Sequence, residues 1–306
     1  MNPSSSIAVP RLAGAPRCVL PAAASLGEGL LWSVREQALY WVDILEKRLY
    51  RFDPASGAQR EWQFEEEISA LAERASAPGL AVTLRRGFAL FDPAAPDARP
   101  QWLHQPEPDQ PANRFNDGKC DAHGRFWAGT MDFDCVAPTG SLYRLDPDGR
   151  CSRHDGGFAV TNGPTWSLDG RTLYFNDTVK GVILAYDFDP AQGTLSHRRQ
   201  WLRFARGDGL PDGMTTDAAG RIWVAHWGGR CVSCHDPSSG EELARIELPV
   251  SQVTNCAFGG PELRTLYISS AKVGLDAARL ATEPLAGGLF AVDIDSPGLP
   301  AALFAS

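Results

Sequence analysis

Residues 161–178, TNGPTWSLDGRTLYFNDT, have the pattern of two β-strands joined by a tight turn. Trp166 and Leu168 alternate with polar residues up to the turn at Asp169-Gly170, and Leu173, Phe175 and their neighbours lead out again to Asn176-Asp177. Two such segments on either side of an Asp-Gly dipeptide are typical of a β-hairpin. The first strand opens with an unusual polar segment, Asn162-Gly163-Pro164, which bears on function as well as on fold.

The same hairpin pattern recurs along the chain at a spacing of about 40 to 50 residues, the length of a four-stranded propeller blade. The apolar or aromatic centres of the six repeats are Tyr40, Leu80, Trp127, Tyr174, Trp223 and Tyr267. The sequence therefore predicts an all-β protein, a six-bladed β-propeller with four-stranded blades. A pair of β-sandwiches is the alternative, but it does not explain the regular period.

Residues 17–306 are expected to form a single propeller domain, preceded by a flexible N-terminal tail over residues 1–16. The extended segment 17–20 is expected to pair with the last blade and close the ring, because closure removes exposed strand edges. Helix signals are confined to residues 65–73 and 275–282.

The formal net charge of -8 disfavours nucleic acid and anionic membranes as partners, since both are bound mainly through Lys and Arg. We find no signal peptide and no stretch of about twenty apolar residues, so a cytoplasmic protein is expected. A monomer or a weak homo-oligomer is the expected assembly.

Seven cysteines, an odd number with uneven spacing, indicate free thiols rather than a disulfide framework. Cys231-x-x-Cys234 suggests a zinc or redox site, but no second pair and no βαβ context accompany it. We expect two cysteines within one strand. The chain also lacks a Gly-x-Ser-x-Gly motif, which disfavours a serine hydrolase.

One polar position precedes each strand centre by about eleven or twelve residues, at the expected start of the innermost strand of each blade. The six residues are Glu28, Ser69, Asn116, Asn162, Asp212 and Asn255. In a propeller, these side chains would converge on one mouth of the central channel. Glycine follows several of them and permits close backbone approach, although Asn-Gly and Asp-Gly also occur simply as turns.

Converging carboxylates repel one another unless protons or a cation intervene. Glu28, Asn162 and Asp212 offer only oxygen ligands and two formal negative charges. That set suits one hard divalent ion such as Ca²⁺, Mg²⁺ or Mn²⁺, although carboxylates also accept Zn²⁺ or Fe²⁺.

The third repeat adds a cation and an amide, in Asn113-Arg114-Phe115-Asn116-Asp117-Gly118-Lys119. Arg114 and Asn116 are candidates for binding polyol hydroxyls or a carboxylate, because the guanidinium forms a fixed fork of donors.

Five segments together resemble the family of gluconolactonase, regucalcin (senescence marker protein) and bacterial sugar lactonases. They are Leu26-Gly27-Glu28-Gly29, residues 113–119, Gly129-Thr130-Met131, Thr161-Asn162-Gly163-Pro164 and Pro211-Asp212-Gly213. The resemblance implies a six-bladed propeller that holds one divalent metal through Glu28, Asn162 and Asp212. It also implies substrate contacts from Arg114 and Asn116, with the metal-bound Asp212 as the catalytic acid and base.

Two positions depart from the family pattern. Leu30 stands where the family usually has proline after Glu-Gly. An acidic substrate contact, a glutamate in some members, corresponds here to Asp134 or Asp132, of which Asp134 is our candidate.

The sequence thus leads to the hypothesis that the protein hydrolyses a sugar-derived lactone, a pentono- or hexonolactone, with a divalent metal in the channel. A non-catalytic, calcium-binding protein similar to regucalcin is one alternative. A metal-dependent esterase or phosphotriesterase is another, since a polarising metal acts on several electrophiles.

Overall fold

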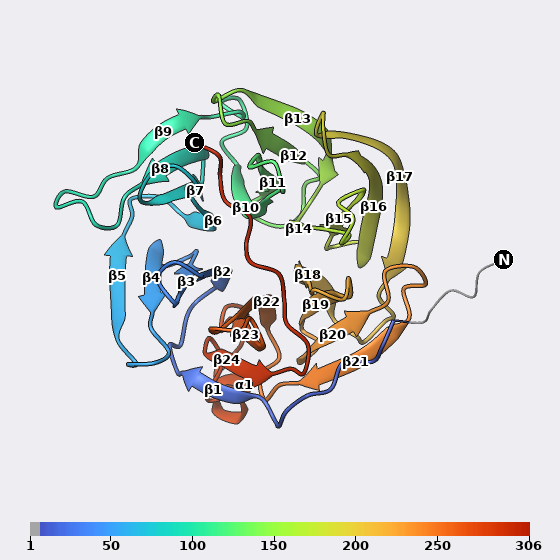
Figure 1. Ribbon diagram of the computed structural model, residues 1–306. Helices are drawn as coiled ribbons and strands as arrows, with labels where there is room; N and C mark the ends of the chain where they lie inside the picture. The colour runs from blue at the N-terminus through green and yellow to red at the C-terminus, as the bar shows by residue number, and fades with distance from the viewer. Residues whose placement is uncertain (1–6) are drawn as a thin grey trace.

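The computed structural model describes residues 7–306, which form six four-stranded antiparallel sheets arranged around a central axis (Figure 1). Five sheets are built from consecutive strands, β2 to β5, β6 to β9, β10 to β13, β14 to β17 and β18 to β21. The sixth has the order β1-β24-β23-β22. The predicted all-β, six-bladed propeller is therefore confirmed.

The innermost strands contact their counterparts in neighbouring blades and surround the axis. They are β2 (Gly27–Ser33), β6 (Ile68–Glu73), β10 (Asn113–Cys120), β14 (Thr161–Trp166), β18 (Leu210–Thr216) and β22 (Val253–Gly259). The second strands are β3 (Ala38–Asp43), β7 (Leu80–Leu84), β11 (Phe126–Asp132), β15 (Thr172–Asp177), β19 (Ile222–Trp227) and β23 (Thr265–Ser270). All six predicted strand centres lie in these second strands.

The outer half of each blade is less buried than the inner half. The third strands are β4 (Arg48–Phe52), β8 (Gly87–Phe91), β12 (Gly140–Leu145), β16 (Val182–Asp189), β20 (Cys231–His235) and β24 (Leu289–Asp293). The outermost strands are β5 (Gln59–Gln63), β9 (Gln101–His104), β13 (Cys151–Phe158), β17 (Thr194–Arg203), β21 (Glu242–Glu247) and β1 (Arg17–Leu20). Cys231 and Cys234 lie together in β20, buried and free, as expected of strand cysteines.

The N-terminal strand closes the ring, because β1 pairs antiparallel with β24 as the sequence predicted. The preceding residues also contact the protein. Leu12 bridges Ile294, and the carbonyl of Ala8 accepts a hydrogen bond from Arg221. The expected flexible tail thus has backbone contacts from Ala8 onward, while its residues 1–6 lie outside the described part of the chain.

One of the two predicted helices is wrong. Residues 68–73 form strand β6, whose side chains are all buried between neighbouring blades, so burial overrides the local helix signal. The other is confirmed as α1 (Ala277–Thr282), which Asp276 caps by accepting from the backbone N–H of Arg279. No helix within residues 7–306 is long and apolar enough to span a membrane.

Two blades repeat the sequence Asp-x-x-Gly-Arg-x-Trp at the hairpin between their first two strands. In the fifth blade, Asp217 accepts hydrogen bonds from Arg221 Nε at 2.6 Å and from Trp223 Nε1 at 2.9 Å. Asp121 is bonded in the same way in the third blade. These carboxylates are buried and fully paired, so they serve the fold rather than the channel.

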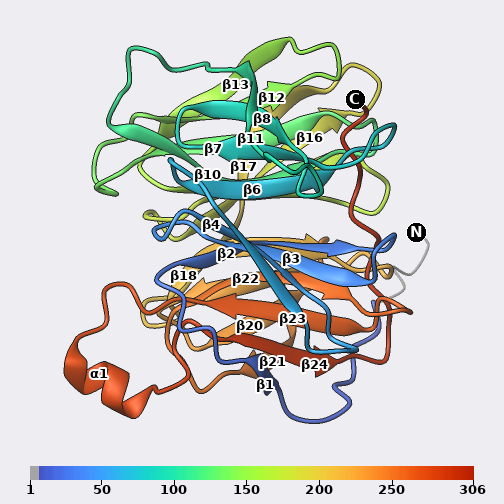
Figure 2. The same cartoon turned by 90° about the vertical axis from the view of Figure 1, so that its left-hand side faces the viewer.

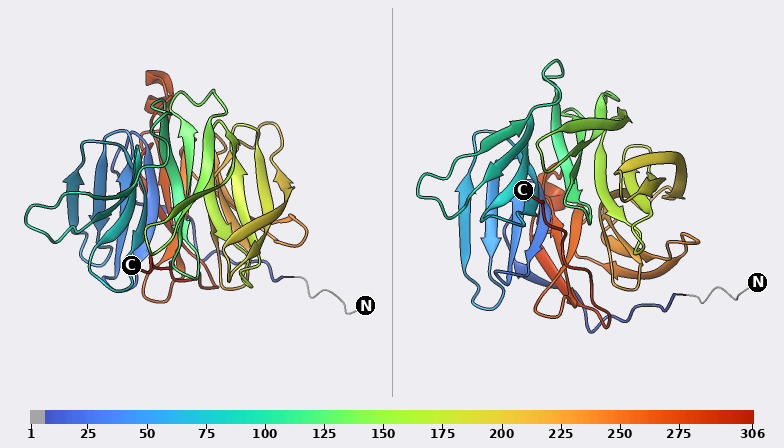
Figure 3. Two further views of the ribbon diagram at one scale, coloured as in Figure 1. Left: turned by 90° about the horizontal axis from the view of Figure 1, so that it is seen from above. Right: turned by 45° about the horizontal axis from the view of Figure 1, so that its top comes forward.

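The C-terminal segment, residues 297–304, crosses one face of the ring over its centre (Figure 1). It leaves the sixth blade, where the backbone N–H of Gly298 donates to Leu263, and ends beside the second, where Phe304 N–H donates to Glu73. We call this segment the C-terminal strap. Figures 2 and 3 show that α1 projects from the opposite face.

Candidate functional site

The six predicted polar residues all lie in innermost strands and are buried. In every blade, the pairing between the first and second strands shifts register next to the polar residue. The shifts fall at Glu28/Leu31, Ile68/Ala70, Phe115/Gly118, Asn162/Thr165, Pro211/Met214 and Val253/Asn255. A bulge re-aims side chains out of strict alternation, which explains how each repeat directs a polar group inward.

Glu28 and Asp212 bring two carboxyl groups together in the channel. Burial, and after it the charge of Asp117, raise the pKa of Glu28 to about 8. Burial also raises the pKa of Asp212 well above its usual range, with the charges of Glu28 and Asp117 adding to the effect. Asp212 Oδ1 is buried and has no hydrogen-bond partner within residues 7–306. The charged forms of both groups are therefore disfavoured in the channel as it stands.

The amide of Asn162 is held with its oxygen toward the neighbouring blade. Its Nδ2 donates to Thr178 Oγ1 at 3.0 Å, and Thr178 in turn donates to the carbonyl of Pro211 at 2.8 Å. Its Oδ1 accepts from Asn116 Nδ2 at 2.9 Å. Thr178 thus fixes which atom of the amide is available as an oxygen ligand.

Arg114 lies buried beside this group, 5% exposed. Its Nη1 donates to Asn116 Oδ1 at 2.6 Å and to the carbonyl of Phe115 at 3.0 Å. Burial lowers its pKa, whereas the nearby acidic residues, Glu28 and Asp212 among them, act in the opposite direction. Its Nε and Nη2 donate to no protein acceptor in the described residues, so they are free to meet a ligand.

The sequence reasoning did not select Asp117, a third buried carboxyl group. Its Oδ1 accepts from Gly118 N–H at 2.8 Å and its Oδ2 from Gly163 N–H at 3.0 Å. Strict alternation would direct Asn116 and Asp117 to opposite faces, but the bulge turns both toward the fourth blade. The adjoining Asn-Asp-Gly was the available signal.

Asn255 and Ser69 differ in their contacts. Asn255 Nδ2 donates to Glu28 Oε2 at 3.0 Å and so joins the group. Gly213 permits this arrangement, because a β-carbon there would lie 2.3 Å from the Asn255 side chain. Ser69 instead shares a hydrogen bond with Thr83 in its own blade.

The acidic groups of the loop after β11 do not reach into this cluster. Asp132 Oδ2 accepts from the backbone N–H groups of Val136 and Ala137 at 2.9 and 2.7 Å, and it therefore caps the loop. Asp134 is exposed on the same loop. Phe133, which lies between these two residues in the sequence, packs against Arg114. The Cζ atom of the Arg114 guanidinium lies 5.8 Å from the centroid of the Phe133 ring.

The donor chemistry of this cluster fits a hard divalent cation. Glu28, Asn162 and Asp212 supply oxygen atoms only, and the unpartnered Asp212 Oδ1 is the kind of atom that a cation would satisfy. Within residues 7–306 no three His, Cys, Asp or Glu side chains form a metal-binding group, so the set depends on the amide of Asn162.

Residues 26–272 match the model of the SMP-30/gluconolactonase/LRE-like region. The chain is 41% identical over 293 residues to the 6-deoxy-6-sulfogluconolactonase of Pseudomonas putida, covering 94% of this chain and 98% of the relative. It is 34% identical over 281 residues to human regucalcin, covering 90% and 93%.

Among solved structures, the calcium-binding protein regucalcin from Agrobacterium tumefaciens superposes with a TM-score of 0.90 at 29% identity. The superposition covers 95% of this chain and 98% of that one. The family match spans most of the sequence, and both curated relatives match nearly end to end. The chain therefore belongs to the SMP-30/gluconolactonase/LRE-like family.

Proposed function

We propose that the protein hydrolyses a sugar-derived aldonolactone, a pentono- or hexonolactone, to the aldonic acid. One observation carries the proposal: Glu28 and Asp212 are two buried carboxyl groups that influence each other, and Asp212 Oδ1 has no partner within residues 7–306. The orientation of the Asn162 amide in the neighbouring innermost strand supports it. The name of the Pseudomonas putida relative, a gluconolactonase, supports a lactone as the substrate class.

Glu28, Asn162 and Asp212 would hold the divalent ion. The candidates are Ca²⁺, Zn²⁺, Mn²⁺, Mg²⁺ and Fe²⁺, and adding each ion to the metal-stripped protein would distinguish them. When bound, such an ion supplies positive charge that polarises the lactone carbonyl and lowers the pKa of the attacking water. The same charge offsets the repulsion between Glu28 and Asp212.

Asp212 is the proposed acid and base. Its carboxylate takes a proton from the attacking water as the new carbon–oxygen bond forms, and returns a proton to the ring oxygen as the ring bond breaks. Water and lactone are thereby converted to one hydroxy acid, with no other reactant needed.

Arg114 is the proposed substrate-orienting residue, because two of its guanidinium nitrogens remain available in a buried setting. Asn116 Nδ2 already donates to Thr161 O and Asn162 Oδ1, so Asn116 would act on the substrate mainly by positioning Arg114 and Asn162. Asp134 would approach a substrate only from the exposed loop.

The test is lactone opening by metal-stripped protein, followed in a pH-indicator assay with each divalent ion added back. The panel contains pentonolactones, hexonolactones, a simple ester and a phosphotriester. We expect lactone turnover that depends on metal and that Asp212→Ala abolishes. The exposed Asp97→Ala is the matched control and should retain turnover.

Undiminished turnover by Asp212→Ala would contradict the mechanism. Metal uptake without turnover of any lactone would instead favour a binding protein, the alternative suggested by the name of the Agrobacterium tumefaciens protein, a calcium-binding regucalcin. Turnover of the phosphotriester alone would favour the esterase alternative.

A further inference from the structure

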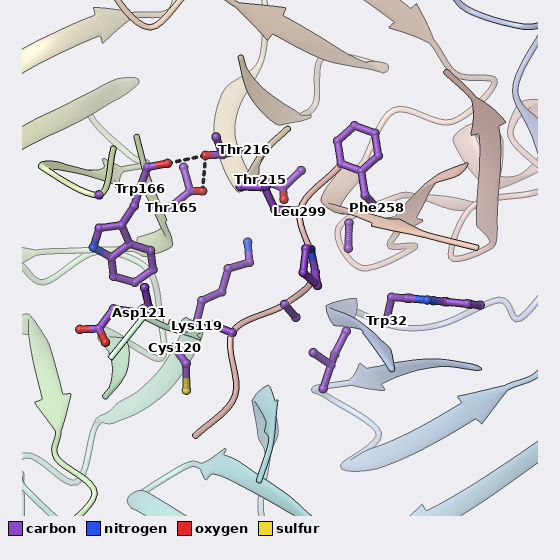
Figure 4. A pocket seen from close by; sticks show the side chains of 18 of the residues that line it. Trp32, Lys119, Cys120, Asp121, Thr165, Trp166, Thr215, Thr216, Phe258 and Leu299 are labelled. Atoms are coloured by element: carbon purple, nitrogen blue, oxygen red, sulfur yellow. Dashed lines mark hydrogen bonds between the residues drawn. The ribbon is translucent and has the colours of Figure 1, made fainter. Parts of the chain in front are cut away.

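A cavity of about 280 Å³ lies further along the channel, between the buried polar cluster and the C-terminal strap (Figure 4). All six innermost strands line it, through residues that follow the polar position in each strand. One residue from each strand, in blade order, is Trp32, Leu71, Lys119, Trp166, Thr215 and Phe258. We call this cavity the far chamber. At about 3.3 Å per strand residue, Thr215 lies roughly 10 Å along β18 from Asp212.

The C-terminal strap forms the roof of the far chamber through residues 299–302. Backbone hydrogen bonds anchor it at both ends, from Gly298 to Leu263 at 2.7 Å and from Phe304 to Glu73 at 2.8 Å. Residues 299–303 between these anchors make no backbone hydrogen bond to any described residue. The roof is thus held by backbone hydrogen bonds at its ends only.

Lys119 places an ammonium group in this chamber, as Figure 4 shows. An ammonium has three N–H donors, and only one acceptor is found for it within the described chain, the carbonyl of Met214. Lys119 forms no ion pair there, whereas Lys47 and Lys180 both pair with carboxylates. Two donors of a half-buried cation are therefore left for a ligand or water.

The acidic groups closest in sequence to Lys119 are already engaged. Asp117 accepts from two backbone N–H groups, and Asp121 is paired with Arg125 and Trp127. Both residues line the far chamber together with Lys119, and the charge of Lys119 opposes the rise in the pKa of Asp117 that burial causes. Neither carboxylate forms an ion pair with the ammonium within residues 7–306, so its remaining donors face the chamber.

The hydroxyl group of Thr215 adds a second polar group to the far chamber, whereas the neighbouring threonine hydroxyls are already engaged. Thr216 donates to the carbonyl of Trp166 at 2.7 Å, so the 2.8 Å bond between Thr165 and Thr216 must be donated by Thr165. Thr215 has no such partner in the described residues, and its side chain lines the chamber. Indole and phenyl rings form much of the remaining wall, which suits a flat apolar body.

We propose that the far chamber binds a small organic carboxylate, with its charge on Lys119 and Thr215 and its apolar body among Trp32, Trp166 and Phe258. A volume of about 280 Å³ limits the ligand to a compact molecule. None of the proposed metal ligands, Glu28, Asn162 and Asp212, lines this chamber, so the carboxylate site is distinct from the proposed lactone site.

The proposed function adds a consequence, which holds only if that function is right. The buried acidic residues of the channel, Glu28, Asp117 and Asp212, outnumber its two cations, Arg114 and Lys119. A divalent ion held by Glu28, Asn162 and Asp212 would make the net charge of these channel groups positive. It would therefore favour the binding of an anion in the far chamber. Metal and carboxylate should then strengthen each other's binding, because coupling between sites is reciprocal.

Isothermal titration calorimetry with benzoate tests the chamber, with neutral benzamide as the matched probe. We expect benzoate to bind the whole protein roughly ten- to a hundredfold more tightly than benzamide. The reason is that neutral benzamide cannot form the charge-assisted hydrogen bond that a carboxylate forms with the Lys119 ammonium. Lys119→Met should remove this preference, whereas Lys180→Met, the same change at an exposed lysine, should keep it.

Thr215→Val keeps the chamber's shape and should weaken benzoate binding by a smaller factor, which preserves the test if Lys119→Met unfolds. Unchanged benzoate affinity in Lys119→Met, or equal affinity for both probes, would overturn the proposal. If benzoate bound equally well with and without a divalent ion, and Lys119→Met still weakened its binding, the carboxylate site in the far chamber would be supported. The same result would count against a divalent ion bound by Glu28, Asn162 and Asp212.

Discussion

The substitution Glu28→Gln should stabilise the metal-stripped protein at alkaline pH. Glu28 is 5% exposed, and its pKa rises from 4.5 to about 8, chiefly through burial and then through the charge of Asp117. The folded protein therefore holds the proton more tightly than the unfolded chain. The stabilisation from the protonated group is complete below about pH 4.5 and is lost as the pH rises through 8.

The magnitude follows from the two pKa values. At 1.36 kcal/mol for each tenfold change in proton affinity, the difference between 4.5 and about 8 corresponds to up to about 5 kcal/mol of unfolding free energy. Glutamine has no proton to lose and stays neutral at pH 8.5, so the variant avoids this penalty, and its amide oxygen can still accept the hydrogen bond from Asn255. We expect the variant to exceed the metal-stripped wild type in stability at pH 8.5 but not at pH 4.5.

Urea denaturation with a chelator at both pH values provides the assay. Glu73→Gln is the control, because Glu73 is also buried but bonds to Ser33 outside the channel cluster. Adding a divalent ion should stabilise the wild type and the control at pH 8.5, but not Glu28→Gln. If Glu28→Gln gained no more stability than Glu73→Gln between the two pH values, the reasoning about the channel carboxylates would be refuted.

Three further substitutions test other parts of the account. Arg114→Lys keeps the charge but loses the planar fork, so steady-state kinetics should show KM raised about tenfold, and an unchanged KM would remove Arg114 from substrate binding. Asp217→Ala leaves the buried Arg221 unpaired and should lower the unfolding free energy by about 3–5 kcal/mol in urea titrations. Phe304→Ala should cost about 3–5 kcal/mol by the same measurement, because the ring is 1% exposed among the core residues beneath the strap; a loss below 1 kcal/mol would show that the strap does not stabilise the ring.

The fold was predictable because each repeat contains short-range sequence patterns, namely strand residues followed by turn residues. Each strand centre, from Tyr40 to Tyr267, falls in the second strand of its blade, since alternation and turn residues fix both strand and register. Pairing of residues 17–20 with the last blade followed from the need to protect a strand edge.

Other features depend on long-range packing and carry no local pattern. Residues 68–73 show a helix signal, but strand β6 is selected because neighbouring blades bury both of its faces. The path of the C-terminal strap rests on contacts such as Phe304 with the second and third blades, hundreds of residues away in sequence. The far chamber beneath the strap was hidden for the same reason.

The candidate site was predictable at the level of one residue per blade. Counting back from each strand centre located Glu28, Asn162 and Asp212, because all six blades share one register. The supporting residues were not predicted. Asp117 requires knowledge of the bulge beside it, and Thr178, which fixes the Asn162 amide, lies in a loop with no pattern of its own.

The most direct test of the central claim is the position of a bound divalent ion, measured by anomalous X-ray scattering from crystals of the protein grown with Mn²⁺. The account predicts one strong peak in the channel, in contact with oxygen atoms of Glu28, Asn162 and Asp212. A channel without a peak, or a peak held by other residues, would contradict it.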